Sequence, residues 1–217
     1  MRSIIKTAKI SPHVASQIDK AVEILRGGGI AAFPTDTVYG LGAAVFNLEA
    51  VEKVYEIKQR SRSIPLPILI AGIEQVTIVA ETVPDIAWLL IRHFWPGGLT
   101  LVLPKAISLP ANITSGSNRV AVRFPNHIVP VSLIRGLGTP IIGTSANISG
   151  KPSTLTAQEV KQQLGRRVDF VIDGGRCPGG VESTIVDVVE EIPVILRKGI
   201  IPVEKIEEIS NRNIQTR

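Results

Sequence analysis

Residues 30–42, IAAFPTDTVYGLG, are the stretch on which the prediction of the fold depends. Residues 30–33 are a short apolar run typical of a strand covered on both faces, and Pro34 then removes a backbone donor and ends the ladder. Four hydrogen-bonding side chains follow directly, namely Thr35, Asp36, Thr37 and Tyr39. The end of a strand is where α/β sheets bind ligands, so this turn is predicted to floor an active site. Taken alone, it is equally consistent with a polar loop whose glycines only allow tight turning.

A second strand end of the same kind follows residues 140–143. This apolar run opens into TSANISGKPS at residues 144–153, whose small polar side chains are Thr144, Ser145, Asn147, Ser149 and Ser153. Two such loops in one chain favour a ligand site over two packing turns. The Gly150-Lys151 pair does not indicate a P-loop, because Ser145 stands where the first glycine is required and Pro152 where a hydroxyl would reach magnesium.

Basic side chains flank two of the predicted strands. Lys58, Arg60 and Arg62 lie just before a strand around residues 68–71, and on spacing alone a solvated surface is the better interpretation of that cluster. Arg119 and Arg123 are four apart on another strand, so their side chains emerge on one side of it. Such a pair is a good clamp for a carboxylate or a phosphate, with exposed ion pairing as the alternative.

Amphipathic and apolar segments alternate along the chain. Helices are predicted at residues 12–26, 48–58, 82–94, 156–165 and 203–209. Some strands, notably within residues 99–124 and 183–196, are too close in sequence for helical crossovers. With no linker and no repeat, the chain is predicted to be a single α/β domain at residues 1–210, with one twisted, mixed parallel and antiparallel sheet flanked by helices. Residues 104–118 are expected to form a flap, and residues 211–217 a frayed tail.

Composition limits the class of protein. The chain has 24 Lys and Arg against 19 Asp and Glu, a net charge of +5, which favours polyanionic partners without choosing between nucleotide and RNA. Cys177 is the single cysteine, which excludes a disulfide framework and a thiolate metal cluster, and the three histidines have no ligand spacing. Because no apolar run has the length of a signal-peptide core or a bilayer span, the protein is expected to be soluble and cytoplasmic, with no membrane partner.

Seven motifs occur in the order found in one known family. They are PTDTVYGLGA at 34–43, KxR at 58–60 with PL at 65–66, WPGGLTLVL at 95–103, VAVRFP at 120–125, TSANISGKPS at 144–153, ESTIVD at 182–187 and LRKG at 196–199. Together they resemble the YrdC-like threonylcarbamoyl-AMP synthases, in their short, single-domain form, over nearly the whole chain. The resemblance implies a YrdC-like fold with a basic concave cleft.

The same resemblance implies an enzyme, a nucleotidyltransferase. L-threonine and bicarbonate would form a carbamate that attacks the α-phosphate of ATP, giving threonylcarbamoyl-AMP and pyrophosphate for the N6-threonylcarbamoyl modification of tRNA adenosine. ATP and bicarbonate would be substrates, Mg²⁺ would accompany ATP with its protein ligands unknown, and tRNA and downstream threonylcarbamoyl-transferase proteins would be partners. Attack of one anion on another requires cations, donors and alignment rather than a side-chain nucleophile.

Site residues carry over from the family motifs one by one. The residues implied to hold L-threonine are Thr37, Arg123, the Gly143 backbone and Ser183. Those implied to hold ATP are Arg60, Arg119, Ser145, Asn147, Ser153 and Arg197. Lys58 and Arg60 are the implied catalytic pair, with Lys58 also at the phosphates.

One departure from the family pattern and two alternative functions accompany the resemblance. Some relatives carry a histidine near the threonine site where this chain has Leu69, so threonine selectivity would rest on other contacts. An alternative function is an RNA- or tRNA-binding module that uses the same basic groove without catalysis. A third function is carbamoyl-AMP formation in hydrogenase maturation, where a similar domain sits beside cysteine-rich fingers in a longer chain. The single cysteine of this chain excludes it.

Overall fold

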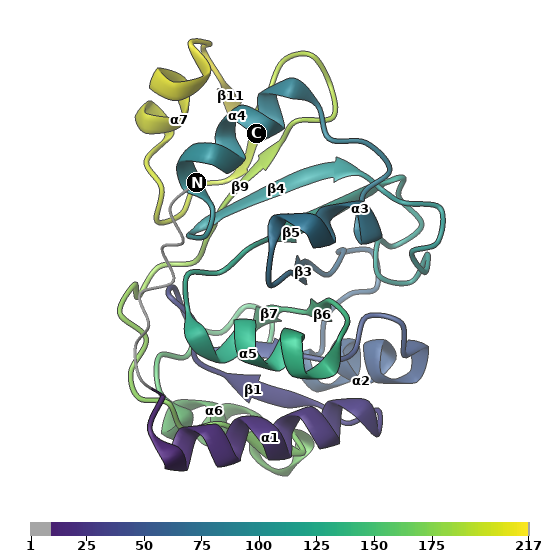
Figure 1. Ribbon diagram of the computed structural model, residues 1–217, viewed down its shortest axis with the longest axis vertical. Helices are drawn as coiled ribbons and strands as arrows, with labels where there is room; N and C mark the ends of the chain where they lie inside the picture. Colours follow the sequence, from purple (N-terminus) through teal and green to yellow (C-terminus); the bar gives the residue numbers. More distant parts are fainter. Residues whose placement is uncertain (1–9, 217) are drawn as a thin grey trace.

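The structure is a computed structural model that describes residues 10–216, so the predicted start of the domain, within residues 1–9, and Arg217 lie outside it (Figure 1). Its α-helices are α1 (Pro12–Arg26), α2 (Leu48–Lys58), α3 (Val76–Val79), α4 (Asp85–Phe94), α5 (Ile128–Leu137), α6 (Ala157–Leu164) and α7 (Val203–Ser210). Two 3-10 turns, η1 (Ile73–Gln75) and η2 (Gly165–Arg167), accompany them. None of these helices is both long and apolar enough to cross a bilayer.

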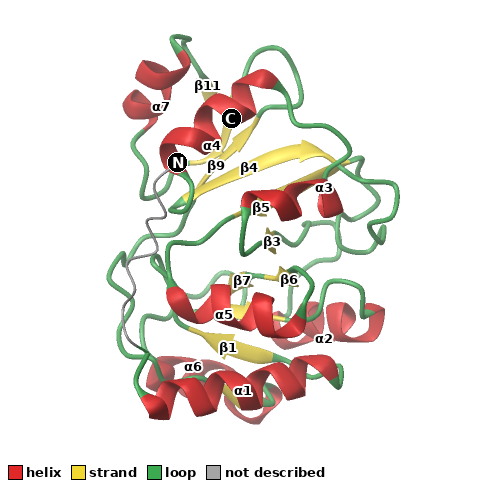
Figure 2. Ribbon diagram, in the orientation of Figure 1, coloured by secondary structure: helices red, strands yellow, loops and turns green. Residues whose placement is uncertain are grey.

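The strands of the described residues form two sheets (Figure 2). The four-stranded sheet has the order β7-β2-β1-β8 and consists of β1 (Ala31–Phe33), β2 (Gly40–Gly42), β7 (Thr144–Ser145) and β8 (Phe170–Val171). The seven-stranded sheet has the order β11-β10-β9-β4-β5-β3-β6 and consists of β3 (Ile68–Leu69), β4 (Leu99–Pro104), β5 (Arg119–Arg123), β6 (Ile141–Ile142), β9 (Thr184–Asp187), β10 (Val194–Arg197) and β11 (Gln215–Thr216).

The predicted mixed pairing is confirmed, but the strands are divided between two sheets where the sequence predicted one. β1 pairs antiparallel with β2 and parallel with β8, while β4 pairs antiparallel with β5 and parallel with β9. In Figure 1 the helices α1, α2, α5 and α6 surround the small sheet, and α4 and α7 lie beside the large one. Residues of both sheets line one cavity, which is described below.

Local sequence explains where α2 begins and ends, and that helix delivers two of the predicted site residues. The side chain of Asn47 caps its start by accepting a hydrogen bond from the Ala50 amide at 3.0 Å. Gln59 adopts a left-handed conformation, φ 51°, which stops the helix directly after Lys58. Lys58 is therefore held at a helix end, and Arg60 begins the following loop.

Several segments differ from the prediction, including α3, which was not predicted, and α4, which begins at Asp85 rather than at residue 82. Helix α5 was missed, because its N-cap is His127, whose Nδ1 accepts from the Val129 amide at 3.2 Å, an uncommon cap. Residues 104–118 do not form a free flap: Leu109 and Ile113 are buried in the core. The predicted frayed tail contains β11, which pairs in parallel with β10. The domain boundary at residue 210 stays a prediction.

Candidate active site

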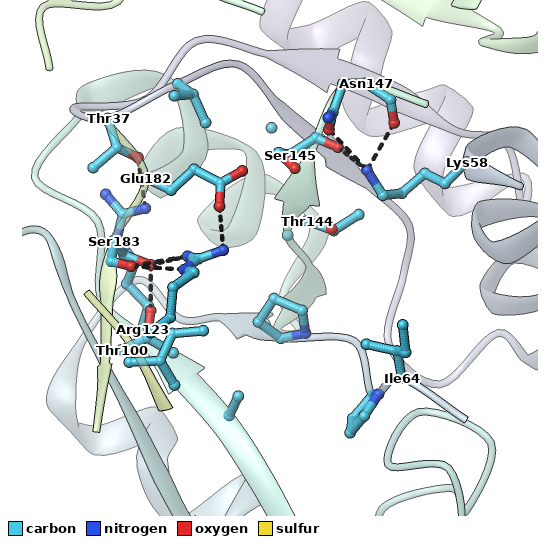
Figure 3. A pocket seen from close by; sticks show the side chains of 18 of the residues that line it. Thr37, Lys58, Ile64, Thr100, Arg123, Thr144, Ser145, Asn147, Glu182 and Ser183 are labelled. Carbon is cyan, nitrogen blue, oxygen red and sulfur yellow. Dashed lines mark hydrogen bonds and ion pairs between the residues drawn. The ribbon is translucent and has the colours of Figure 1, made fainter. Parts of the chain in front are cut away.

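A cavity of about 540 Å³ lies between the two sheets, within the size range of small-molecule sites (Figure 3). One wall comes from the turn before β2, the end of α2 and β7 with its following loop. The other wall comes from β3, β4, β5, β9 and β10. Both polar strand ends that the sequence singled out therefore face the same space.

Gly143 marks the point where the chain crosses from one sheet to the other. β6 ends at Ile142 in the large sheet and β7 starts at Thr144 in the small one. A Cβ atom on Gly143 would lie 2.2 Å from Cγ of Leu69, so only glycine fits beside that side chain. The Gly143 amide already donates to the carbonyl oxygen of Pro67 at 2.9 Å. Leu69, which replaces the histidine of some relatives, gives this part of the cavity an apolar wall.

Lys58 is a buried cation with 1% of its surface exposed. Its Nζ donates to the carbonyl oxygen of Ser145 at 2.5 Å, and to the carbonyl oxygen and Oδ1 of Asn147 at 2.8 and 3.1 Å. Burial, with a smaller contribution from the Arg60 guanidinium, lowers the pKa of Lys58 to about 7, and Glu182 opposes this. The three oxygen acceptors stabilise the protonated form, which predominates below about pH 7, and bond it to the loop that Ser145 and Asn147 begin.

Arg60 lines the cavity from a different position. Its guanidinium donates only to the carbonyl oxygens of Ile64 and Pro65, at 3.2 and 3.0 Å, and it has no carboxylate partner among the described residues. Burial lowers the pKa of Arg60, but an arginine stays charged at neutral pH. By contrast, Arg62, two residues on, pairs with Glu52 at 2.8 Å and does not line the cavity.

Arg123 reaches the floor of the cavity from β5. Its Nε donates to the Gly97 carbonyl oxygen at 2.9 Å, Nη1 to Oγ1 of Thr37 at 2.8 Å and Nη2 to Asp36 at 2.6 Å. Two of its five N–H groups have no partner among the described residues and can bind a ligand. Arg123 is thus hydrogen-bonded directly to the polar turn at residues 35–39.

Ser183 and Arg197 form the wall opposite Lys58, as Figure 3 shows for Ser183. Arg197 donates through Nε and Nη2 to the Ser183 carbonyl oxygen at 3.1 and 2.9 Å, and through Nη2 to Ser183 Oγ at 3.0 Å. Ser183 Oγ also lies 2.8 Å from Oγ1 of Thr100. The remaining Nη1 of Arg197 pairs with Glu182.

The cavity collects most of the predicted site residues. Nine line it: Thr37, Lys58, Arg60, Arg123, Gly143, Ser145, Asn147, Ser183 and Arg197. Two do not. Arg119 pairs with Asp187 and Glu190, and Ser153 lies behind Glu182, to which its hydroxyl donates at 2.7 Å. Arg119 and Arg123 do share one side of β5, but only Arg123 reaches the cavity.

Several lining residues were missing from the predicted site. They are Thr35, Thr100, Thr144, Ser149, Lys151 and Glu182. The sequence did carry a signal for most of them: Thr35 lies in the first polar turn, Thr144, Ser149 and Lys151 lie within TSANISGKPS, and Glu182 directly precedes Ser183 in ESTIVD. The buried hydroxyl of Ser149 has no hydrogen-bond partner among the described residues, which marks it as a candidate ligand contact.

The donor set gives little support for a metal held by the protein alone. Among residues 10–216 no three His, Cys, Asp or Glu side chains come together as a metal site. Glu182 is the one carboxylate that the described lining contains, and it is already paired. A Mg²⁺ ion typically needs only one or two carboxylates when substrate phosphates supply the other ligands. The described lining therefore fits Mg²⁺ only where a bound phosphate group supplies most of the ion's ligands.

Comparisons with known proteins agree with this geometry. The Sua5_yciO_yrdC family model, described as telomere recombination, matches residues 23–199. The threonylcarbamoyl-AMP synthase of Pyrococcus abyssi is 46% identical over 189 residues, 87% of this chain and 56% of that protein. That of Bacillus subtilis is 45% identical over 194 residues, 89% of this chain and 56% of that protein.

Similarity extends to solved structures. The crystal structure of P. abyssi Sua5 complexed with L-threonine matches with a TM-score of 0.89 and 44% identity, over 92% of this chain and 58% of that chain. The chain therefore spans little more than half the length of these relatives.

Proposed function

The chain belongs to the Sua5/YciO/YrdC family, and on that premise we propose that it is an L-threonylcarbamoyladenylate synthase. The reaction condenses L-threonine, bicarbonate and ATP to threonylcarbamoyl-AMP and pyrophosphate. Two relatives near 45% identity carry this activity in their names, and the P. abyssi Sua5 structure is a complex with L-threonine. The product would serve the threonylcarbamoyl modification of tRNA adenosine by downstream transferase proteins in the cytoplasm.

One observation carries the proposal: Lys58, Arg123 and Arg197, far apart in sequence, converge on a single cavity. The proposed reaction brings a carbamate anion to a triphosphate, and the repulsion between them must be offset by fixed positive charge. The described lining holds five Lys or Arg side chains and one carboxylate. That charge ratio suits two anionic reactants better than a neutral ligand.

L-threonine is proposed to lie against the floor of the cavity. The two free N–H groups of Arg123 would bind its carboxylate as a fork, beside the hydroxyls of Thr37 and Ser183. The Gly143 amide is already bonded to Pro67, so the contribution of that residue is close approach of the backbone rather than its N–H.

ATP is proposed to lie between the two walls, with Arg197 on one and Arg60, Ser145 and Asn147 on the other. In the proposed step the threonine nitrogen first takes up CO₂ from bicarbonate, with loss of a proton and water. A carbamate oxygen then attacks the α-phosphorus, and the bond to pyrophosphate breaks. Arg60 and Lys58 would stabilise charge on the phosphoryl oxygens, and Mg²⁺ bound to ATP would supply further neutralisation. Arg119 and Ser153 remain predicted contacts that lie outside the lining.

The experiment compares two neighbouring arginines. Pyrophosphate release is measured with ATP, L-threonine and bicarbonate, and with each of the three omitted in turn. Arg60→Ala should lower the rate by about a hundredfold, the effect of removing one well-placed donor. Arg62→Ala, whose side chain is 61% exposed and bound to Glu52, is the matched control and should keep the wild-type rate.

The outcome that contradicts the proposal is wild-type protein that releases no pyrophosphate when all three substrates are present. If that protein also bound tRNA in a salt-sensitive manner, the cavity would instead belong to an RNA-binding module. Equal rates for wild type, Arg60→Ala and Arg62→Ala would remove Arg60 from the mechanism.

A further inference from the structure

Glu182 is an anion in the middle of a cationic site. Among the described residues that line the cavity it is the only acidic side chain, while the basic ones are Lys58, Arg60, Arg123, Lys151 and Arg197. Figure 3 shows its side chain extending between Thr37 and Ser145. A carboxylate in that position would repel both reactants proposed above, so its presence requires a reason.

The contacts of the Glu182 carboxylate are well defined. The Ser153 hydroxyl donates to Oε1 at 2.7 Å, and Nη1 of Arg197 donates to Oε2. Burial raises the pKa of Glu182, but the Ser153 hydrogen bond, the Arg197 charge, the Ser145 hydroxyl and the Lys58 charge together lower it overall. The side chain is therefore an anion at neutral pH, and donors from both walls of the cavity are directed at it.

Two of these donors, Ser145 and Arg197, are groups that the proposed function assigns to the nucleotide, and Ser153 is a predicted nucleotide contact that lies outside the lining. A phosphate of ATP and the carboxylate of Glu182 cannot both accept from the same hydroxyls and guanidinium. We propose that the Glu182 carboxylate is an internal substitute for a nucleotide phosphate. The carboxylate occupies the anion subsite, the position that faces these donors, when the cavity is empty, and it leaves that subsite when ATP binds. The inference rests on the proposed function, because it takes that subsite to be the ATP site.

The surroundings of Glu182 permit this exchange. Its backbone is fixed, since its carbonyl oxygen accepts from the Ile200 amide at 2.9 Å. Its side chain is 30% exposed and the preceding Val181 is exposed, so the carboxylate can rotate towards solvent without moving the core. While ATP is absent, the carboxylate keeps Arg197 and Ser153 in place and offsets the repulsion among the cations. ATP therefore competes with the Glu182 side chain for the anion subsite.

Isothermal titration of Glu182→Gln with ATP in the absence of L-threonine, and separately with pyrophosphate, tests this exchange. The amide has the shape of the carboxylate without its charge, so both ligands should bind about tenfold or more tightly than to wild type, the effect of removing a like charge beside a bound anion. L-threonine should bind as it does to wild type. Glu52→Gln is the matched control, because Glu52 also pairs with an arginine but lies outside the cavity, and it should leave all three affinities unchanged.

Unchanged or weaker binding of ATP and pyrophosphate by Glu182→Gln overturns the inference. A loss confined to L-threonine affinity also overturns it, and assigns the carboxylate to the ammonium group of the amino acid instead. Should Glu182→Gln fail to melt cooperatively, Glu182→Ala is judged by the same criterion. Failure of the proposed function is seen separately, as wild-type protein that releases no pyrophosphate with all three substrates.

Discussion

The Nζ atom of Lys58 lies 2.5 Å from the carbonyl oxygen of Ser145, and this contact joins the end of α2 to β7. The bond is reinforced on the backbone, where the carbonyl oxygen of Lys58 accepts from the Ser149 amide at 2.8 Å. Lys58 therefore has two roles in the structure. It places a positive charge at the cavity, and it holds the loop that carries Ser145 and Asn147.

Lys58→Met should lower both activity and stability. Methionine keeps the length of the side chain but leaves three buried oxygens without a donor, at about 1–3 kcal/mol each, offset in part because a buried charge is also removed. We expect a net loss of roughly 1–3 kcal/mol in urea denaturation, with pyrophosphate release reduced about a hundredfold. Lys53→Met, on the same helix, should change neither quantity, and a fully stable Lys58→Met would refute the supporting role.

Arg123→Lys should weaken the binding of L-threonine and leave the binding of ATP nearly unchanged. Lysine keeps the charge but loses the planar fork, together with at least one of the bonds to Gly97, Thr37 and Asp36. The KM for L-threonine should rise about 10- to 100-fold, in line with lost charge-assisted hydrogen bonds, while the KM for ATP stays within about twofold. Arg92→Lys on the exposed side of α4 serves as the control. A parallel rise in both KM values would place Arg123 elsewhere in the reaction.

Gly143→Ala should destabilise the protein through contact with one side chain. The added Cβ would lie 2.2 and 2.4 Å from Cγ and Cδ1 of Leu69, and such overpacking costs about 1–3 kcal/mol. The double variant Gly143→Ala/Leu69→Ala should be more stable than the sum of the two single variants predicts, by about 0.5–3 kcal/mol. Gly27→Ala, where a Cβ meets nothing closer than 3.5 Å, is the control. Additive free energies in the cycle would show that Leu69 and residue 143 do not interact.

Lys58 should also give the free energy of unfolding a pH dependence. Its pKa is about 7 in the folded protein, and about 10.4 when the side chain is exposed by unfolding. Between these values the unfolded state binds more protons, so stability should rise with pH by up to about 1.4 kcal/mol per unit. Two other groups contribute at the edges of the range from about pH 7 to 8.5: burial lowers the pKa of His127, which adds to the rise near pH 7, and burial raises the pKa of Cys177 to about 11, which lowers stability as the unfolded thiol ionises near 8.5. The contribution of Lys58 is therefore the difference in slope between wild type and Lys58→Met in urea denaturation, and an equal slope in the two proteins would rule out the assignment.

The sequence was most informative where local rules decide the structure. Helix α2 was predicted with the bounds it has, because Asn47 is a good N-cap and the apolar spacing is regular. The polar strand ends at residues 35–39 and 144–153 were predicted as a site, and the structure brings them to one cavity. These predictions needed only residues close together in the chain.

Other features of the structure depend on tertiary contacts and could not be predicted from the sequence. Arg119 and Arg123 have the same spacing signal, but only the structure shows that Asp187 and Glu190 bind the first. Residues 104–118 lack periodicity, yet Leu109 and Ile113 are anchored in the core. Glu182 was overlooked because a lone carboxylate in a basic site contradicts the expected chemistry, and its significance depends on which donors surround it.

The passage of the chain between the two sheets at a single residue limits how the protein can exchange its ligands. On one side of Gly143, the Ile142 amide is bonded to the carbonyl oxygen of Ala43, and on the other Ser145 pairs with Gly40. A hinge motion at Gly143 would therefore strain or break these neighbouring bonds. Access to the cavity is expected past exposed side chains at its rim, such as Ile64 and Leu196, rather than by separation of the two sheets.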